Sequence, residues 1–276
     1  MEVSSELYSE FNYESESKPT VDYRNVVSKF SFVYPIPPPE HDSDGDLIVK
    51  RKSELTKRGI VEIEHSKRTE LSLVGLQVWR GALLLADWIL YNGEQLVKRN
   101  SKILELGSGT GLTSIVASMF SHVVCTDVNK GDILKLLQAN ITRNNSYSKY
   151  TSLVTEIDFT KRNLNDDVIS ALPDIEIIIA ADVIYDNQLT EDFVKMLQLF
   201  LGYPQIKAIF VALEKRYVFT ISDCDVSAPC YDFFIECLQK LDDISVEELP
   251  IHFPQYFQYE RVKELVLLKI KNRKNG

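Results

Sequence analysis

Three glycines stand at alternate positions, Gly107, Gly109 and Gly111, directly after the short apolar run 102–106. Glycine lacks a Cβ atom, so its backbone can adopt positive φ angles and approach a ligand closely. A helix that begins after such a loop adds unpaired backbone N–H groups. This order of strand, loop and helix suits a site for a nucleotide-type cofactor, although tight strand-to-helix turns also occur for purely structural reasons.

The residues around this loop discriminate between cofactors. A dinucleotide fingerprint has its third glycine five positions after the first, where this chain has Leu112. No lysine follows the loop in the manner of a P-loop. Glu105, which precedes the loop, would repel a phosphate and attract an amino group that carries a positive charge. A cofactor with a ribose, an amino-acid moiety and no phosphate fits best, and S-adenosylmethionine is such a molecule.

Two further groups of polar residues follow predicted strands and could bind an adenosine. Asp127 comes 20 residues after Gly107, where a carboxylate can accept hydrogen bonds from both ribose hydroxyls. Its alternative role is to cap the next helix, for which Asp132 is better placed. Asp158 and Phe159 could bond the adenine amino group and lie against the ring, or they could form an ordinary turn with a core aromatic residue.

A third group, from Asp182 to Tyr185, follows the most apolar of the predicted strands. The run 175–181 is too continuously apolar for a half-exposed strand and suits a central parallel strand that is covered on both faces. Functional groups in such sheets lie beyond the carboxyl ends of the strands, which makes this group a candidate site. The alternative is that the strand simply ends there and a capped helix begins.

The elements that position these residues alternate between strands and helices, which predicts a doubly wound, mostly parallel seven-stranded α/β sheet. Strands are predicted over 102–106, 122–127, 152–157, 175–181, 207–213, 244–249 and 264–270. Helices are predicted over 77–91, 110–119, 131–143, 189–201 and 230–241. The length of 276 residues and a hydrophobic content of 45% suit one such domain, which we place at 47–276.

The region 1–46 differs in composition, with ten acidic residues against three basic ones and a cluster of prolines. We expect it to be a disordered acidic tail. A hairpin is predicted to follow, with strands at 47–49 and 60–64. The basic cluster between them fits either a nuclear-import signal or a solvated turn, and comprises Lys50, Arg51, Lys52, Lys57 and Arg58.

Composition also excludes some classes of partner. The formal net charge of -9 argues against general electrostatic binding of nucleic acid. We expect neither a secretory signal peptide nor a membrane span, and the four scattered cysteines suit a reducing compartment. The four histidines show no ligand spacing, so no metal site is expected.

The segment from Glu105 to Gly111, together with Asp127 and the segment from Asp182 to Tyr185, resembles the class I methyltransferases. More narrowly, it resembles the seven-strand lysine methyltransferases, which carry an Asp-x-x-Tyr motif after the fourth strand. The segments 63–65, 77–87 and 211–216 support this resemblance, which covers roughly residues 47 to 272. The acidic tail remains unexplained by it.

The resemblance implies a protein-lysine N-methyltransferase that uses S-adenosylmethionine. In the cofactor site it implies that Trp79 lines the cavity, Asp127 holds the ribose and Ala180 passes its backbone along the adenosine. The loop that would lie against the methionine portion consists of Gly107, Ser108, Gly109, Thr110 and Gly111. Trp79 could instead be an ordinary core residue of its helix.

For the substrate, the resemblance implies a protein with an acceptor lysine, in the nucleus. We expect the enzyme itself to be a monomer located in the nucleus, the cytoplasm or both. Asp182 would recruit and aim the lysine, because a carboxylate stabilises ammonium rather than deprotonating it. Tyr185 would shape the pocket by cation–π and hydroxyl contacts. Glu214 would contact the substrate or, alternatively, pair with Lys215 or Arg216.

Three other functions compete with this interpretation. An adenine-specific nucleic-acid methyltransferase would carry a polar-Pro-Pro-aromatic motif where the group from Asp182 to Tyr185 stands. An NAD-dependent oxidoreductase would share the sheet and Asp127, but Leu112 breaks its fingerprint. A module that binds the cofactor without catalysis is harder to exclude from sequence.

Overall fold

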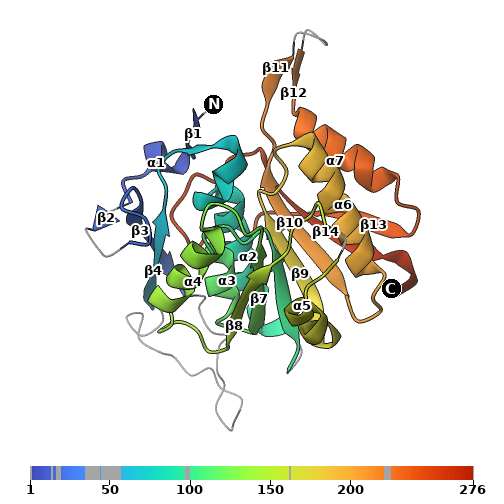
Figure 1. Ribbon diagram of the computed structural model, residues 1–276, viewed down its shortest axis with the longest axis horizontal. Coiled ribbons are helices and arrows are strands. Elements are labelled where there is room, and N and C mark those ends of the chain that lie inside the picture. Colours follow the sequence, from blue (N-terminus) through green and yellow to red (C-terminus); the bar gives the residue numbers. More distant parts are fainter. Residues whose placement is uncertain are drawn as a thin grey trace.

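A computed structural model of the chain describes residues 2–13, 15–16, 20–34, 44, 57–96, 100–161, 163–220 and 225–275. Its centre is a sheet of seven strands: β6 (Lys102–Leu106), β7 (His122–Asp127), β8 (Ser152–Glu156), β9 (Ile175–Ala181), β10 (Ala208–Glu214), β13 (Ile244–Leu249) and β14 (Leu265–Asn272). The α-helices are α1 (Leu7–Glu10), α2 (Arg80–Leu96), α3 (Leu112–Ala117), α4 (Ile133–Arg143), α5 (Asp166–Ala171), α6 (Asn187–Leu201) and α7 (Pro229–Gln239). Figure 1 shows this arrangement.

The strand order in the sheet is β13-β14-β10-β9-β6-β7-β8. The pairs from β10 to β8 are parallel, whereas β14 runs antiparallel to both β10 and β13. This confirms the predicted fold, a doubly wound and mostly parallel seven-stranded sheet. The order reverses between β6 and β9, so the loops that follow these two strands diverge and leave a crevice where ligands bind in such sheets.

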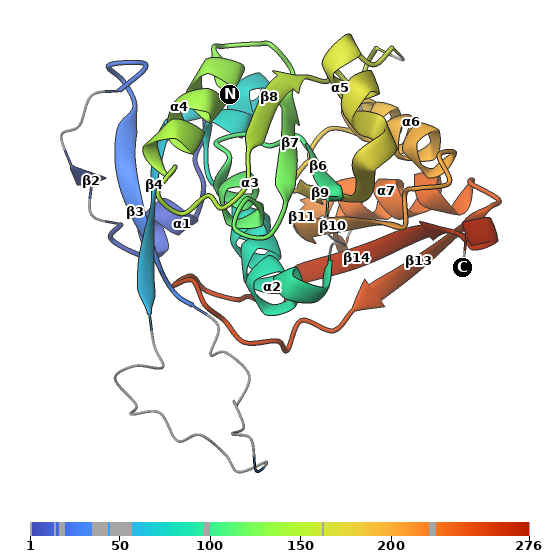
Figure 2. The same cartoon turned by 90° about the horizontal axis from the view of Figure 1, so that it is seen from below.

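Side chains alternate between the two faces of the central strands, as the pleat requires. On β9, Ile177 and Ile179 join the cluster with α2 and α3, whereas Ile178 and Ala180 join the cluster with α6 and α7. Figure 2 shows α2, α3 and α4 on one side of the sheet and α5, α6 and α7 on the other. The central strands are therefore covered on both faces, as predicted from the run 175–181.

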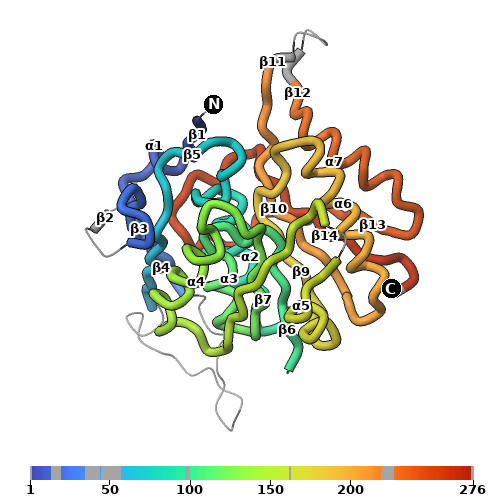
Figure 3. The backbone as a smooth tube through the Cα atoms, in the orientation of Figure 1, coloured from blue at the N-terminus to red at the C-terminus, as the bar shows by residue number. Residues whose placement is uncertain are grey.

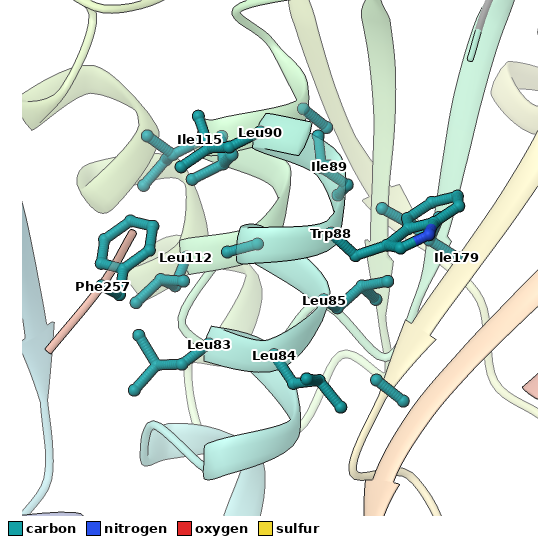
Figure 4. Packing of buried hydrophobic residues seen from close by; sticks show 14 of the residues in the cluster. Leu83, Leu84, Leu85, Trp88, Ile89, Leu90, Leu112, Ile115, Ile179 and Phe257 are labelled. Carbon is teal, nitrogen blue, oxygen red and sulfur yellow. The ribbon is translucent and has the colours of Figure 1, made fainter. Parts of the chain in front are cut away.

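Helix α2 is the core helix of the first of these layers. Its residues Leu83, Leu84, Leu85 and Ile89 are fully buried, and Figure 4 shows them packed against α3 and the sheet. Among the described residues, the segment Leu71–Leu96 is long and apolar enough to cross a membrane by length and composition, and 72% of its apolar window is buried inside the fold.

The described part of region 1–46 is folded, which corrects the prediction of a disordered tail. Leu7 is fully buried, and the strand β3 (Val26–Val33) buries Phe30 and Phe32 to 1% exposure. The acidic composition hid a short alternation of apolar residues in Val26–Val33, which is enough for a strand that has a partner. The strand β2 (Ser15–Glu16) pairs with the other edge of β3.

The predicted hairpin has a different partner strand. The strand β4 (Arg58–His65) pairs antiparallel with β3, and 47–49 lies outside the described residues. Side-chain oxygens of Asn140 in α4 and of Asn144, which directly follows α4, accept hydrogen bonds from the backbone of β4, at 2.8 and 2.9 Å. Figure 2 shows the hairpin beside α4. Of the basic cluster, Lys57 and Arg58 are exposed and the other members are not described.

Sequence analysis missed several short elements. They are β1 (Glu2–Val3), β5 (Thr69–Glu70), the 3-10 helices η2 (Leu71–Leu76), η3 (Leu172–Asp174) and η4 (Arg273–Asn275), helices α1 and α5, and a hairpin of β11 (Val218–Thr220) and β12 (Asp225–Ser227). The hairpin projects from the body of the molecule in Figure 1. Figure 3 shows β1 beside β5, with which it pairs.

Candidate functional site

The glycine loop follows β6 and has the predicted backbone. Gly107, Gly109 and Gly111 have φ angles of 70°, 53° and 88°. Gly111 is the residue before α3 and does not line the cavity described below; its contact with a cofactor stays a prediction. A Cβ atom on Gly109 would lie 2.8 Å from the backbone oxygen of Gly75, which only glycine permits.

Asp127 fixes this loop to the end of β7. Its Oδ2 accepts a hydrogen bond from the backbone of Gly109 at 2.8 Å, and its Oδ1 accepts one from Val128 at 2.8 Å. Burial raises the pKa of this carboxyl to about 6. Asp127 does not cap α4, where Asp132 precedes the helix without a side-chain hydrogen bond. Each carboxylate oxygen retains a second lone pair, so the residue can still accept from a ribose.

Glu105 lies beneath the loop and is 1% exposed. Its carboxylate accepts a hydrogen bond from Ser114 in α3. Burial raises its pKa to about 7, while the hydroxyls of Ser114, Ser108 and Thr113 oppose the rise. The residue therefore anchors the start of α3 and also presents a carboxylate to the cavity above the loop.

A cavity of about 510 Å³, which we call the first cavity, lies above the glycine loop. Segment 71–79, which includes η2, covers one side of it. Sequence analysis missed this cover, although Gly75 between apolar residues was a signal for a close approach. The predicted cofactor residues that line the first cavity are Trp79, Glu105, Gly107, Ser108, Gly109, Thr110, Asp127, Asp158 and Phe159.

Ala180 does not line the first cavity. It is fully buried within β9, between Leu106 and Val211, and its neighbour Ala181 lines the cavity instead. Successive residues of a strand face opposite sides of the sheet, and the contact of the Ala180 backbone with an adenosine stays a prediction. A match to a motif cannot resolve this alternation.

Asp158 and Phe159 lie at the rim of the first cavity. Asp158 accepts hydrogen bonds from the backbone and hydroxyl of Thr160, at 3.0 and 2.7 Å, and lies 3.2 Å from the ammonium of Lys161. These contacts hold the pKa of Asp158 below its usual value, although burial opposes them. Its carboxylate thus forms the ordinary turn that was the alternative prediction. Phe159 packs against Phe193, with ring centroids 5.2 Å apart.

Asp182 follows β9 with a positive φ of 51° and joins two distant segments. Its Oδ2 accepts a hydrogen bond from Gly81 in the first turn of α2 at 2.6 Å, and its Oδ1 accepts one from Glu214 at 3.1 Å. Burial raises its pKa to about 6, and the charge of Arg216 opposes the rise. Asp182 therefore holds the start of α2 against the end of β10. The next helix, α6, is capped by Asp186 instead.

A second cavity of about 420 Å³ lies on the other side of Asp182. Both cavities are lined by Leu71, Val74, Trp79, Asp182 and Tyr185, so they meet at these side chains. The indole of Trp79 donates a hydrogen bond to the backbone of Val74 at 2.9 Å, which fixes the ring between the cavities. Burial raises the pKa of Tyr185 to about 12, so its hydroxyl stays protonated at neutral pH.

Glu214 lines the second cavity. Its Oε1 lies 2.6 Å from a guanidinium nitrogen of Arg80, a contact that was not predicted. Its Oε2 is buried and has no hydrogen-bond partner. A buried carboxylate oxygen without a partner is costly, and a donor that enters the second cavity would satisfy it.

The charge of the first cavity indicates which cofactor it fits. Its described lining residues include five carboxylates, Glu105, Asp127, Asp158, Asp182 and Asp186, against a single ammonium from Lys130. Such a lining disfavours a phosphate and favours a cofactor with positive charge. S-adenosylmethionine carries a sulfonium and an ammonium group and fits this lining. Within the described part of the chain, no group of His, Cys, Asp and Glu residues is placed to hold a metal ion.

A comparison with protein families identifies the domain. A family model described as lysine methyltransferase matches residues 58–245, which include the glycine loop and the strand ends that border both cavities. The chain belongs to this lysine methyltransferase family. The match begins at β4, so β1, α1 and β3 lie outside it.

Individual relatives agree with the family. Methyltransferase-like protein 22 of Mus musculus is 37% identical over 251 residues, covering 82% of this chain and 63% of that protein. The Homo sapiens protein of the same name is 37% identical over 248 residues, covering 82% and 61%. Protein-lysine N-methyltransferase EEF2KMT of Mus musculus is 30% identical over 211 residues, covering 71% and 58%. The chain thus spans about three fifths of the length of these relatives.

Proposed function

We propose that this chain is an S-adenosylmethionine-dependent protein-lysine N-methyltransferase. One observation carries the proposal: a cavity suited to a cationic cofactor meets a second cavity at Trp79, Asp182 and Tyr185. A methyl donor in the first cavity and a lysine in the second would approach each other at these residues. The names of the relatives and the family support the same reaction.

The reaction requires little covalent help from the protein. The cofactor supplies an activated methyl group, which moves to the lysine nitrogen as one carbon–sulfur bond breaks and one carbon–nitrogen bond forms. The side chains position the amine and exclude water. A lysine with a pKa near 10.4 is about 0.1% neutral at pH 7.4, which costs roughly 4 kcal/mol at about 1.36 kcal/mol per pKa unit. Desolvation and the positive sulfonium of the cofactor disfavour the ammonium form and lower this cost, whereas the carboxylate of Glu214 opposes them; solvent accepts the proton.

Each residue at the junction has a separate task in the proposal. Asp182 is a positioning residue, because its oxygens hold the backbone of Gly81 and Glu214. Glu214 binds the incoming lysine through its unpartnered Oε2. Tyr185 closes the junction with its ring and protonated hydroxyl. Recruitment, assigned from sequence to Asp182, thus passes mainly to Glu214.

Labelling an extract of cells that lack the protein tests the proposal. The full chain and S-adenosylmethionine with a labelled methyl group are added, and the modified residues are mapped. We expect label on a lysine of one or a few proteins. An Asp182→Asn variant should lose at least about tenfold in kcat/KM, because an amide cannot accept both backbone N–H bonds, each worth about 1 kcal/mol or more.

The matched control is Asp166→Asn, since Asp166 is an exposed carboxylate in the first turn of α5, remote from both cavities. It should retain the activity of the unaltered chain. Full turnover by Asp182→Asn on saturating substrate would contradict the role of Asp182. Cofactor binding without label on any lysine would support a non-catalytic module, and tighter binding of NAD than of S-adenosylmethionine would support an oxidoreductase.

The proposal extends to location and assembly. We propose a monomer that acts on a protein of the nucleus or the cytoplasm, in keeping with four scattered cysteines and an acidic chain. Imaging of the tagged full chain and its mass by light scattering test these two points. Exclusion from both compartments, or a stable dimer, would contradict them.

A further inference from the structure

Residues 2–10, which we call the N-terminal segment, form part of the second cavity. Glu2, Val3, Ser4 and Glu6 line it together with residues that follow β9 and β10. This segment lies outside the family match at 58–245. A wall of the cavity is therefore built from a part of the chain that the family model does not include.

Specific contacts hold the N-terminal segment in place. β1 pairs with β5, which leads directly into the η2 cover of the first cavity. The side chain of Gln77 accepts a hydrogen bond from the backbone of Ser5 at 2.8 Å and donates one to the oxygen of Val3 at 3.1 Å. Leu7 is fully buried in the core beyond them. The segment is thus fixed on both sides of its cavity-lining residues.

Two arginines connect the segment to the junction of the cavities. Arg80 pairs with Glu10 and with Glu214, and its side chain is only 8% exposed. Arg216 lies 3.0 Å from Glu6, and its guanidinium stacks over the ring of Trp79 at 4.7 Å. The position of the segment is therefore coupled to residues on which the proposed chemistry depends.

The second cavity carries a net negative charge. Its described lining residues include four carboxylates, from Glu2, Glu6, Asp182 and Glu214, against one guanidinium, from Arg216; the guanidinium of Arg80, outside the lining, also pairs with Glu214. Among these carboxylates, the buried Oε2 of Glu214 has no hydrogen-bond partner and needs a donor. Both observations favour a cationic occupant with N–H donors.

We propose that the N-terminal segment is a wall of the substrate channel and that Glu2 and Glu6 bind a basic side chain next to the acceptor lysine. The occupant is a basic segment of the substrate protein, with its lysine directed at Glu214. This inference rests on the proposed function. The segment then contributes specificity, because a substrate with acidic neighbours would meet uncompensated repulsion at the wall.

Three fluorescent peptides test the inference without methyl transfer. Each peptide is eleven residues long. Its centre is lysine flanked by two arginines, lysine flanked by two glutamates, or norleucine flanked by two arginines, and its other residues are glycine and serine. Binding to the full chain, saturated with the product S-adenosylhomocysteine, is measured by fluorescence anisotropy. We expect the first peptide to bind at least tenfold tighter than either of the others.

A double variant, Glu2→Gln with Glu6→Gln, should reduce the preference for arginine over glutamate flanks to threefold or less. The matched control is Glu247→Gln with Glu260→Gln, two exposed carboxylates remote from the cavity, which should retain the full preference. The Glu6–Arg216 pair is partly exposed, so the double variant should fold with nearly the same Tm as the unaltered chain.

The outcomes separate the inference from the proposed function. Equal or absent binding of the peptides, or an undiminished preference in the double variant, overturns the inference even if the chain labels lysines in an extract. Selective binding that the double variant abolishes supports it even if no methyl group is transferred, and the proposed function then fails alone. Equal binding of the lysine and norleucine peptides with arginine flanks also overturns it, because the lysine would then lie outside the channel.

Discussion

The two cavities at the sheet edge are built in different ways. The glycine loop and two of the five carboxylates of the first cavity come from one stretch of chain, from Glu105 to Asp127, and backbone N–H groups hold the carboxylate of Asp127. The second cavity draws on five distant segments, 2–6, 71–79, 182–185, 213–218 and 229–231, and the ion pairs Arg80–Glu214 and Arg216–Glu6 connect parts of it. The first depends on local backbone geometry, and the second depends on tertiary contacts between charged side chains.

This difference separates a general task from a specific one. A cofactor is the same for every member of a fold class, so a site for it can be encoded in a short loop with fixed geometry. A substrate protein presents a surface, and a surface is recognised by segments that can change independently of the loop. Variants that damage one cavity should therefore leave the other largely intact.

The largest expected effect is on the second cavity, from Arg80→Ala. This change leaves Glu10 and Glu214 with buried charges that have lost their partner, which costs about 3–5 kcal/mol of stability. The Tm should fall by roughly 2–4 °C for each kcal/mol. Arg80 lines neither cavity, so the affinity of the folded protein for S-adenosylmethionine should change less than about fivefold.

Thermal unfolding and calorimetric titration of the cofactor check this prediction. Lys102→Ala is the control, because Lys102 pairs with Asp174 at the surface and should lose at most about 1 kcal/mol. If Arg80→Ala lost cofactor affinity as strongly as stability, the two cavities would not be separable in this way.

Gly109→Val should lower the stability less than Arg80→Ala does, but it should abolish the binding of S-adenosylmethionine. The left-handed φ of this residue costs a side chain about 1–2 kcal/mol, and the contact with Gly75 adds about 1–3 kcal/mol. S-adenosylmethionine should no longer raise the Tm of the variant. Gly202→Ala is a control at a right-handed φ of -69°, and it should keep the full rise. A normal rise in Gly109→Val would show that the loop does not cradle the cofactor.

The same contrast explains what the sequence could predict. All seven strands of the central sheet, and the placement of Asp127 and Asp182 at strand ends, followed from apolar runs and from the rule for parallel sheets. The N-terminal segment did not, because its acidic composition resembles a disordered chain while a few residues such as Leu7 determine its folding. Arg80 was also overlooked, since a charge in an apolar helix indicates no partner until the chain is folded.

Local geometry at single residues was likewise beyond the sequence. Gly111 and Ala180 matched a motif, yet neither lines the first cavity. Asp158 could not be distinguished from Asp127 by position, since each follows a parallel strand. The structure separates them by their hydrogen bonds: Asp158 accepts from Thr160 within its own turn, whereas Asp127 holds the glycine loop.

The smallest of the expected effects tests that separation within the first cavity. Asp127→Asn should weaken the binding of S-adenosylmethionine by about 1–3 kcal/mol, because an amide cannot accept from Gly109, Val128 and a ribose with both of its terminal atoms. Asp158→Asn should change the free energy of S-adenosylmethionine binding by less than about 0.5 kcal/mol, since the carboxylate of Asp158 contacts Thr160 and Lys161 rather than the cofactor. Equal losses in the two variants would contradict this assignment.

The pH dependence gives the same test a direction. Burial raises the pKa of Asp127 from 3.8 to about 6, so the ionised carboxylate costs the empty protein stability above that pH. The contribution of Asp127 to the free energy of unfolding should accordingly fall as the pH rises from about 4 to about 6. Cofactor affinity should change in the opposite sense, because the ionised carboxylate is the better acceptor for ribose hydroxyls.

Glu105 and Asp182 also titrate near this range, so the decisive quantity is the difference in cofactor affinity between the unaltered chain and Asp127→Asn, measured by calorimetry between pH 5 and 8. If the plot of cofactor affinity against pH kept the same inflection near pH 6 in the variant, the titration would belong to Glu105 or Asp182. Asp127 would then not bind the ribose.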